Sequence, residues 1–432
     1  MARILDFDDY LLHEIYDHFS LHVLLHLTLV NRRLSKLAQD HIARHVDFAL
    51  VSRSDALWQA IDTHPGFAEK VRRVSNGPLS RDMLDARSLK RLSSLTHLEV
   101  DVSEVELSHA DIVELMFVGR VHTLHVRGTS EWPRISVGPV VQLPIYAAGS
   151  STVERLTFTN LSIDDEAFRH LIHFLRKLKS LSCPLPLPTE SSSSPDSTRK
   201  ILQVLSPAMM QPFLSLFRPS LESINIKVGA TASQVHDGST LDLNHFQSLK
   251  TVVVSASCLF KLITTLDTPV LHTLGNILPT SIESLTVWSA QRSYSGRTAN
   301  TNTEQIIYDR AVECILGLDF VPKRFWEARE IPPEKYAWIL ELTDFKRERL
   351  TSLRHVRLVE HITPLARKYA RADEYVWVPQ HLDRIEDPAG FTFEGIHFAI
   401  IVRTMMPRRA CGFLKASGNS SAWNPGNWPG LG

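Results

Sequence analysis

The six residues from Leu95 to Val100, LTHLEV, contain the pattern that decides how this chain is expected to fold. Their order is apolar-x-x-apolar-x-apolar. Leu98 and Val100 stand two positions apart, so in a strand their side chains point to one face and the residue between them points to the other. The pattern returns, in full or in part, from residues 71, 95, 121, 153, 178, 221, 249 and 282. The first five starts are 24 to 32 residues apart, and a spacing of this size is typical of a repeat protein.

Helical patterns occupy two of the stretches between these predicted strands. They consist of apolar residues at helical spacing, namely Ile112, Val113, Leu115 and Met116 before one strand and Phe168, Leu171, Ile172 and Leu175 before another. A helix between consecutive strands produces a right-handed crossover and a parallel sheet. The sequence therefore predicts an α/β fold with a repeat array over residues 51–290. An ordinary α/β domain with parallel strands is the alternative.

The predicted array resembles the leucine-rich repeat family, in which parallel strands form the concave face of a solenoid. That family normally places Asn or Cys three positions after the last apolar residue of a strand. Here other residues hold those positions: Ser103, Thr129, Leu161, Pro186, Gly229, Ser257 and Ala290. The resemblance thus implies an irregular leucine-rich-repeat-like solenoid, with its curvature and repeat type left open.

The first 50 residues carry three apolar stripes at helical spacing. The stripes are Leu11, Leu12, Ile15, Tyr16 and Phe19; then Leu24, Leu27 and Val30; then Leu34, Leu37, Ala38 and Ile42. Asn31 stands where the third helix would begin and is a favoured N-cap residue. Three helices this short cannot bury all of their apolar faces against one another, so some apolar surface should remain for another protein.

This N-terminal stretch resembles an F-box. The resemblance rests on Leu5-Asp6-Phe7, on the first helix, and above all on residues 20–34, SLHVLLHLTLVNRRL. Asp8 and Val23 depart from the family, which usually has Pro and Asp there. The whole layout also resembles the F-box protein sets of mushroom-forming fungi. F-box proteins dock a Skp-family adaptor, and the residues implied here are Leu5, Phe7, Leu11, Leu12, Ile15, Phe19, Leu24, Leu27 and Val30.

The resemblance implies a substrate-recognition subunit of a Skp-cullin-F-box type ubiquitin ligase, a role that needs no catalytic residue, cofactor or metal. The adaptor would link the chain to a cullin scaffold, and the repeats would hold a target protein. Two other classes stay open. One is a leucine-rich-repeat scaffold that binds proteins without ubiquitin chemistry, with residues 1–50 as a structural cap. The other is a soluble enzyme with an unrecognised site.

The target would meet the residues between the apolar positions of the predicted strands, because these share the opposite face of the sheet. The candidates are Glu99, Asp101, His125, Arg127, Arg155, Asn225, Lys227 and Trp288. Their charge runs from acidic in the early strands to basic in the later ones. Arg and Trp are the residue types that most often carry binding energy at interfaces. A solvated face without a partner is the alternative.

Composition restricts the remaining possibilities. The 432 residues include 47 Lys and Arg and 47 Asp and Glu, so no net charge favours nucleic acid or an anionic membrane. No apolar run reaches the ~18–20 residues of a membrane span. The four cysteines are far apart and the N-terminus does not read as a signal peptide, which favours a cytoplasmic or nuclear protein. His13 and His18 are too far out of phase to share a metal, and no catalytic motif is recognisable.

Four further segments complete the prediction. Residues 52–68 read as a helix, and the Pro- and Ser-rich residues 184–199 read as a flexible loop inserted in the array. Residues 304–406 contain helical patterns over 304–318 and 333–349 and further strand patterns, which would close the end of the array. Residues 407–432 have no apolar period and are predicted to be disordered.

Overall fold

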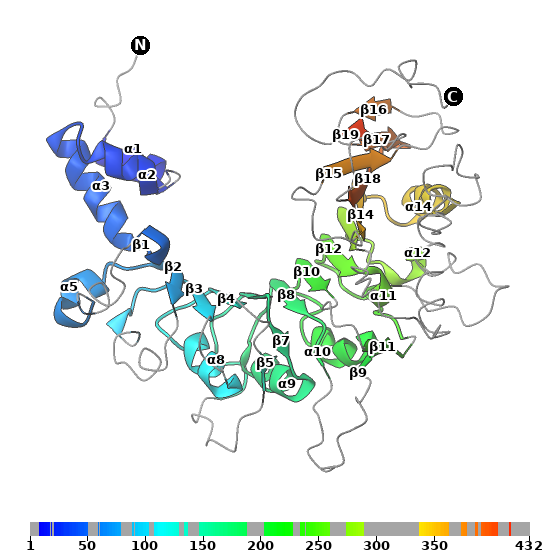
Figure 1. The fold of residues 1–432 in the computed structure, drawn as a ribbon, viewed down its shortest axis with the longest axis horizontal. Helices are drawn as coiled ribbons and strands as arrows, with labels where there is room; N and C mark the ends of the chain where they lie inside the picture. Colours follow the sequence, from blue (N-terminus) through cyan, green and yellow to red (C-terminus); the bar gives the residue numbers. More distant parts are fainter. Residues whose placement is uncertain are drawn as a thin grey trace. The chain divides into compact units, whose positions relative to one another are not determined.

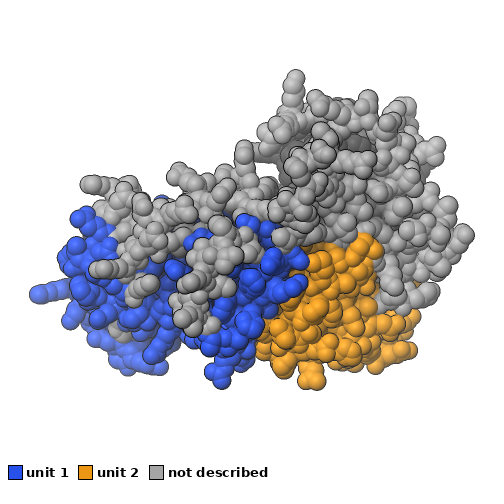
Figure 2. Space-filling view, turned by 90° about the horizontal axis from the view of Figure 1, so that it is seen from below, with its two compact units in different colours: residues 1–178 blue, residues 179–432 orange. Residues whose placement is uncertain are grey.

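The computed structural model of this chain forms two compact units, residues 1–178 and residues 179–432 (Figure 2). The residues that it describes are 8–17, 19, 21–50, 59, 61–78, 89, 91–102, 108–128, 134–136, 147–187, 203–227, 234–237, 239–259, 274–288, 337–362, 373–377, 385–387, 390–404 and 414–415. Each unit combines helices with a mostly parallel sheet, so the α/β class predicted from the sequence is confirmed. Within these residues, no helix is both long and apolar enough to cross a membrane.

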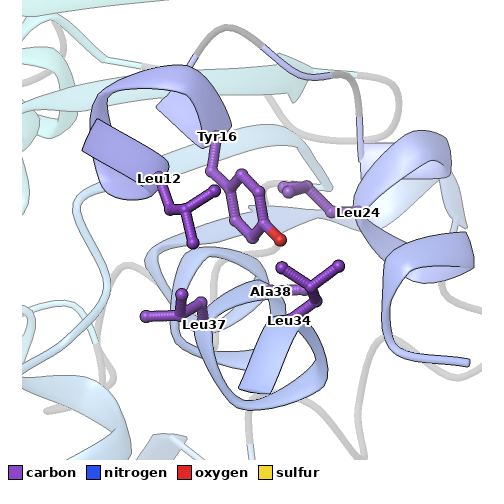
Figure 3. Close-up of a cluster of buried hydrophobic side chains, with 6 residues drawn as sticks. All are labelled: Leu12, Tyr16, Leu24, Leu34, Leu37 and Ala38. Carbon is purple, nitrogen blue, oxygen red and sulfur yellow. The ribbon is translucent and has the colours of Figure 1, made fainter. Parts of the chain in front are cut away.

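The first unit begins with the helices α1 (Asp9–Asp17), α2 (Leu21–Leu27) and α3 (Arg32–Arg44). Their buried side chains form one cluster (Figure 3): Leu12, Tyr16, Leu24, Leu34, Leu37 and Ala38. Asn31 caps α3 as predicted, because its side chain accepts a hydrogen bond of 2.8 Å from the backbone N–H of Arg33. The three helices therefore have a small core of their own.

This core corrects part of the predicted adaptor-binding set. Leu12 and Leu24 are 0% and 4% exposed, so they face the other two helices and not a partner. Leu11 and Val30 are 46% and 67% exposed and remain available. Ile15, Phe19 and Leu27 are partly buried at the margin of the cluster, and the predicted residues Leu5 and Phe7 lie outside the described residues.

A parallel sheet follows α3 directly. Its strands, in order, are β1 (His45–Asp47), β2 (Arg73–Pro78), β3 (His97–Val102), β4 (Thr123–Gly128) and β6 (Arg155–Thr159). One register row across them is entirely buried: Val46, Val74, Leu98, Leu124 and Leu156. The pattern that starts at Leu95 predicted the last four strands. It did not predict β1, and the helical part therefore ends at Arg44, six residues before the expected boundary at residue 50.

Short helices cover the apolar side of this sheet, where Figure 1 shows α8 and α9 on the same side of the strands. The other elements of the first unit are η2 (Phe48–Leu50), α5 (Pro65–Ala68), α8 (His109–Met116), α9 (Asp165–Phe174) and the parallel pair β5 (Arg134–Ile135) and β7 (Ser162–Ile163). Both helical patterns seen in the sequence are confirmed, and α8 begins with a capping box between Ser108 and Asp111. Of the helix predicted over 52–68, α5 and residues 59 and 61–63 are helical, and residues 52–58 and 60 lie outside the described residues.

The second unit repeats this arrangement. Its parallel strands are β8 (Ser180–Pro184), β10 (Ser223–Lys227), β12 (Thr251–Ser255), β13 (Ser284–Trp288), β14 (His355–Ile362) and β18 (Ile396–Thr404). Their buried row is Leu181, Ile224, Val252, Leu285, Val356 and Phe398. The connections contain β9 (Gln203–Leu205), η3 (Pro207–Met210), α10 (Gln211–Ser215), β11 (Gln234–His236), α11 (Ala256–Leu259), α12 (Leu274–Ile277) and α14 (Ala337–Glu348).

Antiparallel strands end the second unit. They are β15 (Asp373–Trp377), β16 (Ile385–Asp387), β17 (Gly390–Phe393) and β19 (Leu414–Lys415). Leu414 and Lys415, which lie in the segment predicted to be disordered, pair with β15, and the rest of residues 407–432 lies outside the described residues. The helix predicted over 304–318 and most of the loop predicted over 184–199 lie outside the described residues.

Two adjacent leucines test the core of the three helices. Leu12→Ala should lower the free energy of unfolding by about 2–5 kcal/mol, because it leaves a cavity beside Tyr16. Leu11→Ala, at an exposed position, should change it by less than about 0.5 kcal/mol. Urea unfolding followed by circular dichroism measures both. Equal losses in the two variants would contradict the packing described here.

Candidate functional site

Exposed apolar side chains are concentrated on the N-terminal helices. Among the described residues, the large hydrophobic side chains of this part that are exposed are Tyr10 (72%), Leu11 (46%), Val23 (39%), Leu29 (83%) and Val30 (67%). Elsewhere in the described chain only Leu216 and Leu340 belong to this class. Apolar side chains grouped on one part of a protein are typical of a protein–protein contact.

The second candidate is the polar face of the sheet in the first unit. Glu99 and Asp101 alternate with buried residues along β3, and His125 and Arg127 do so along β4. The register places Glu99 opposite His125 and Asp101 opposite Arg127. All four predicted residues therefore share one face, as the alternation in the sequence indicated.

Arg127 is held by partners in its own chain. Its Nε and Nη2 atoms donate to the two carboxylate oxygens of Asp101 over 2.8 and 2.7 Å, and Nη2 also donates to Asn76 Oδ1 over 2.7 Å. The hydrogen bond to Asp101 raises the pKa of Arg127 above its ordinary value. Asn76 in turn donates to Asp47 Oδ1 over 2.8 Å. Arg127 thereby links β4 directly to β3 through Asp101 and to β2 through Asn76, and Asn76 extends the network to Asp47 on β1.

His125 belongs to the same network. Its Nε2 atom lies 2.8 Å from Thr159 Oγ1, and its Nδ1 atom lies 3.4 Å from Glu99 Oε1. Burial lowers the pKa of His125, and the neighbouring Glu99 carboxylate opposes that effect. His125 and Glu99 therefore already have contacts within the sheet that a target protein would have to compete with.

The predicted residues of the second unit are also engaged. Asn225 Nδ2 donates to Ser182 Oγ over 3.0 Å. Lys227 Nζ lies 4.4 Å from the ring centroid of Trp288, a cation–π distance. The indole of Trp288 is half-buried, and one of its faces is covered by Lys227. A target protein would therefore have to displace Lys227 to stack on that face.

Arg155 differs from the other predicted target residues. It is exposed, and within the described residues its side chain makes no ion pair or hydrogen bond. Its register row also contains three basic side chains that were not among the predicted target residues: His45, Arg73 and His97. Arg73 stands in Val71-Arg72-Arg73-Val74 at the same offset as His97 in the LTHLEV stretch. Applying that offset to the first repeat would have found it.

Potential metal ligands and cysteine thiols lie in the described part of the chain. No group of three or more His, Cys, Asp or Glu side chains lies close enough there to hold a metal ion. Cys183 and Cys258 are both buried, and burial raises the pKa of the Cys183 thiol. Neutral buried thiols are poor nucleophiles. Neither models of known protein families nor curated proteins match this chain.

Arg127 and Arg155 allow the network to be tested with a matched control. Arg127→Ala should lower the free energy of unfolding by on the order of 1–2 kcal/mol, because Asp101 loses its partner while the pair is part-exposed. Arg155→Ala should change it by less than about 0.5 kcal/mol. Chemical unfolding of both variants makes the comparison. If the two losses were the same, Arg127 would have no structural role.

Stability should also fall in mild acid. Burial lowers the pKa values of His45, His97, His109 and His125 below their ordinary 6.5. These four histidines therefore bind protons less readily in the folded chain than in the unfolded chain. Their contribution to the free energy of unfolding is fully present above about pH 6.5 and is lost as the pH falls toward their lower folded pKa values. Urea midpoints at pH 7.5 and 5.5 should differ, and the difference should shrink in His109→Phe. A midpoint unchanged at pH 5.5 would contradict this.

Proposed function

We propose that this chain is the substrate-recognition subunit of a Skp-cullin-F-box type ubiquitin ligase. The observation that carries the proposal is the group of exposed apolar side chains on α1, α2 and the turn after α2, which includes Leu29 and Val30. Three of these residues, Val23, Leu29 and Val30, belong to the stretch SLHVLLHLTLVNRRL that resembles an F-box. A Skp-family adaptor is the partner that such helices would dock.

The energetics favour a partner for these side chains. Burying an exposed leucine or valine contributes roughly 1.5–3 kcal/mol, so Leu29 and Val30 alone could supply a substantial part of an interface. The helices do not need these residues for their own core, which is built from Leu12, Tyr16 and their neighbours. Exposure of apolar residues that the fold does not use is the pattern expected of a docking surface.

The rest of the proposal concerns the sheets. We infer an irregular leucine-rich-repeat-like solenoid whose concave face presents polar residues to a target protein, supported by the returning sequence pattern and the aligned parallel strands. The chain itself would carry out no reaction. It would hold the target near a ubiquitin-charged enzyme in the cytoplasm or nucleus, which raises the local concentration of the reacting groups.

One observation favours a second candidate, a repeat scaffold whose N-terminal helices are only a cap. Helix α3 ends at Arg44 and the next residue, His45, already belongs to β1. A terminal cap is normally continuous with the array that it covers. This scaffold would bind proteins without ubiquitin chemistry and would not need an adaptor.

Adaptor capture separates the two candidates. A tagged full-length chain co-expressed with a Skp-family adaptor should retain the adaptor on affinity resin. The double variant Leu29→Asp with Val30→Asp should retain at least about tenfold less, because two charges would enter an apolar contact. Leu216→Asp is the matched control, since Leu216 is 64% exposed but lies in the second unit.

Two outcomes would exclude the ubiquitin-ligase proposal. One is failure of the unmodified chain to retain the adaptor. The other is equal retention by the double variant and by the Leu216→Asp control. Because Leu29 and Val30 are 83% and 67% exposed, the double variant should fold normally, and its urea midpoint checks this.

A further inference from the structure

The first residue of each strand in the first unit occupies one register row. From β1 to β6 this row reads His45, Arg73, His97, Thr123 and Arg155. Arg73, His97 and Arg155 are exposed, and we name these three residues the basic row. Arg73 and Arg155 are three strands apart, which at ~4.8 Å per strand corresponds to roughly 14 Å. An extended peptide covers this distance with about four to five residues at ~3.3 Å each.

The basic row has no carboxylate partners within the described residues. Arg73 Nε donates to the hydroxyl of Ser75 over 3.3 Å, and the side chain of Arg155 has neither an ion pair nor a hydrogen bond there. After burial, the charges of Arg73 and Arg155 are the main causes that lower the pKa of His97. The guanidinium groups of Arg73 and Arg155 therefore carry positive charge without a carboxylate partner among the described residues, whereas His97 between them, whose pKa is lowered, is neutral near pH 7.

The second unit provides an internal comparison. The corresponding register row there reads Ser180, Ser223, Thr251, Ser284, His355 and His397. It contains no Arg or Lys. Serine or threonine occupies four of its six positions and histidine the other two, so the fold does not require arginine at this row. Because folding does not need them, the arginines of the first unit are candidates for a binding role.

The next rows on the same face limit the shape of any ligand. Glu99 follows His97 after two positions, and Asp101 follows Glu99 in the same way. The polar face thus carries a narrow positive strip beside carboxylates that are engaged with Arg127 and His125. A broad anion such as a nucleic-acid strand would meet these carboxylates. A short extended segment lying along the strip would not.

We propose that the basic row binds an acidic segment of the target protein, with anionic groups supplied by carboxylates or by phosphorylated side chains. The segment crosses the strands along the row, and each arginine pairs with one anionic group through its planar guanidinium. The biological meaning of this site rests on the proposed function. The binding itself requires no adaptor and is measured separately.

The test uses the purified full-length chain and a fluorescein-labelled twelve-residue peptide of alternating Glu and Ser. A second peptide carries phosphoserine in place of serine, and fluorescence anisotropy measures both affinities. Arg73→Glu with Arg155→Glu should weaken binding by about tenfold or more. Arg218→Glu with Arg357→Glu has the same net charge but changes only exposed residues of the second unit, so its affinity should stay within about twofold. The tighter of the two peptides identifies the source of the anionic groups.

Three results would overturn the inference. They are no binding of either peptide by the unmodified chain, equal affinities of the two double variants, or tighter binding of a twelve-nucleotide single strand that displaces the peptide. If the charge reversal lowers the urea midpoint, the double variant Arg73→Gln with Arg155→Gln is used in its place. A peptide affinity of that variant equal to the affinity of the unmodified chain would then overturn the inference. Adaptor retention by the row variant is measured in parallel. Loss of peptide binding by the row variant with normal adaptor retention would support this site independently of the adaptor. Peptide binding by an unmodified chain that does not retain the adaptor would exclude the proposed function and leave this site in place.

Discussion

The alignment of one buried apolar residue per strand is the constraint on which the rest of this structure depends. Leu98, Leu124 and Leu156 stand in register across parallel strands, and a slip of one residue would turn each of them to the solvent. Because strand side chains alternate, the same alignment places His125 and its neighbours on the opposite face. The core thereby determines which residues are presented for binding.

The fold could be predicted wherever a segment carried its own period. The LTHLEV pattern repeats locally, so it identified β2, β3, β4, β6 and the main strands of the second unit. Strand β1 has a single buried residue, Val46, directly after a helix, and too few positions to show alternation. The pairing of Leu414 with Val376 depends on a contact between distant segments, which no local pattern reports.

The sequence predicted which face of the sheet the candidate residues share. It did not predict which of them already have partners within the chain. Alternation placed Arg127 and Arg155 on the same face, yet one is bound to Asp101 and the other has no partner among the described residues. That difference depends on which carboxylate the register brings beside each arginine. For the same reason the helical stripe could not separate Leu11 from Leu12, because their exposure depends on how the three helices pack.

Asn76 contributes an amide group to the charged network around Arg127. A register shift between Val74 and Gly77 interrupts β2, and Asn76 adopts a φ of 52°, in the left-handed region that Asn tolerates better than most residues. The side chain can then accept from Arg127 and donate to Asp47. The irregularity thus directs one polar group into the network beside Asp101. Arg73 precedes the shift and stays in regular register with His97, which leaves it outside that network.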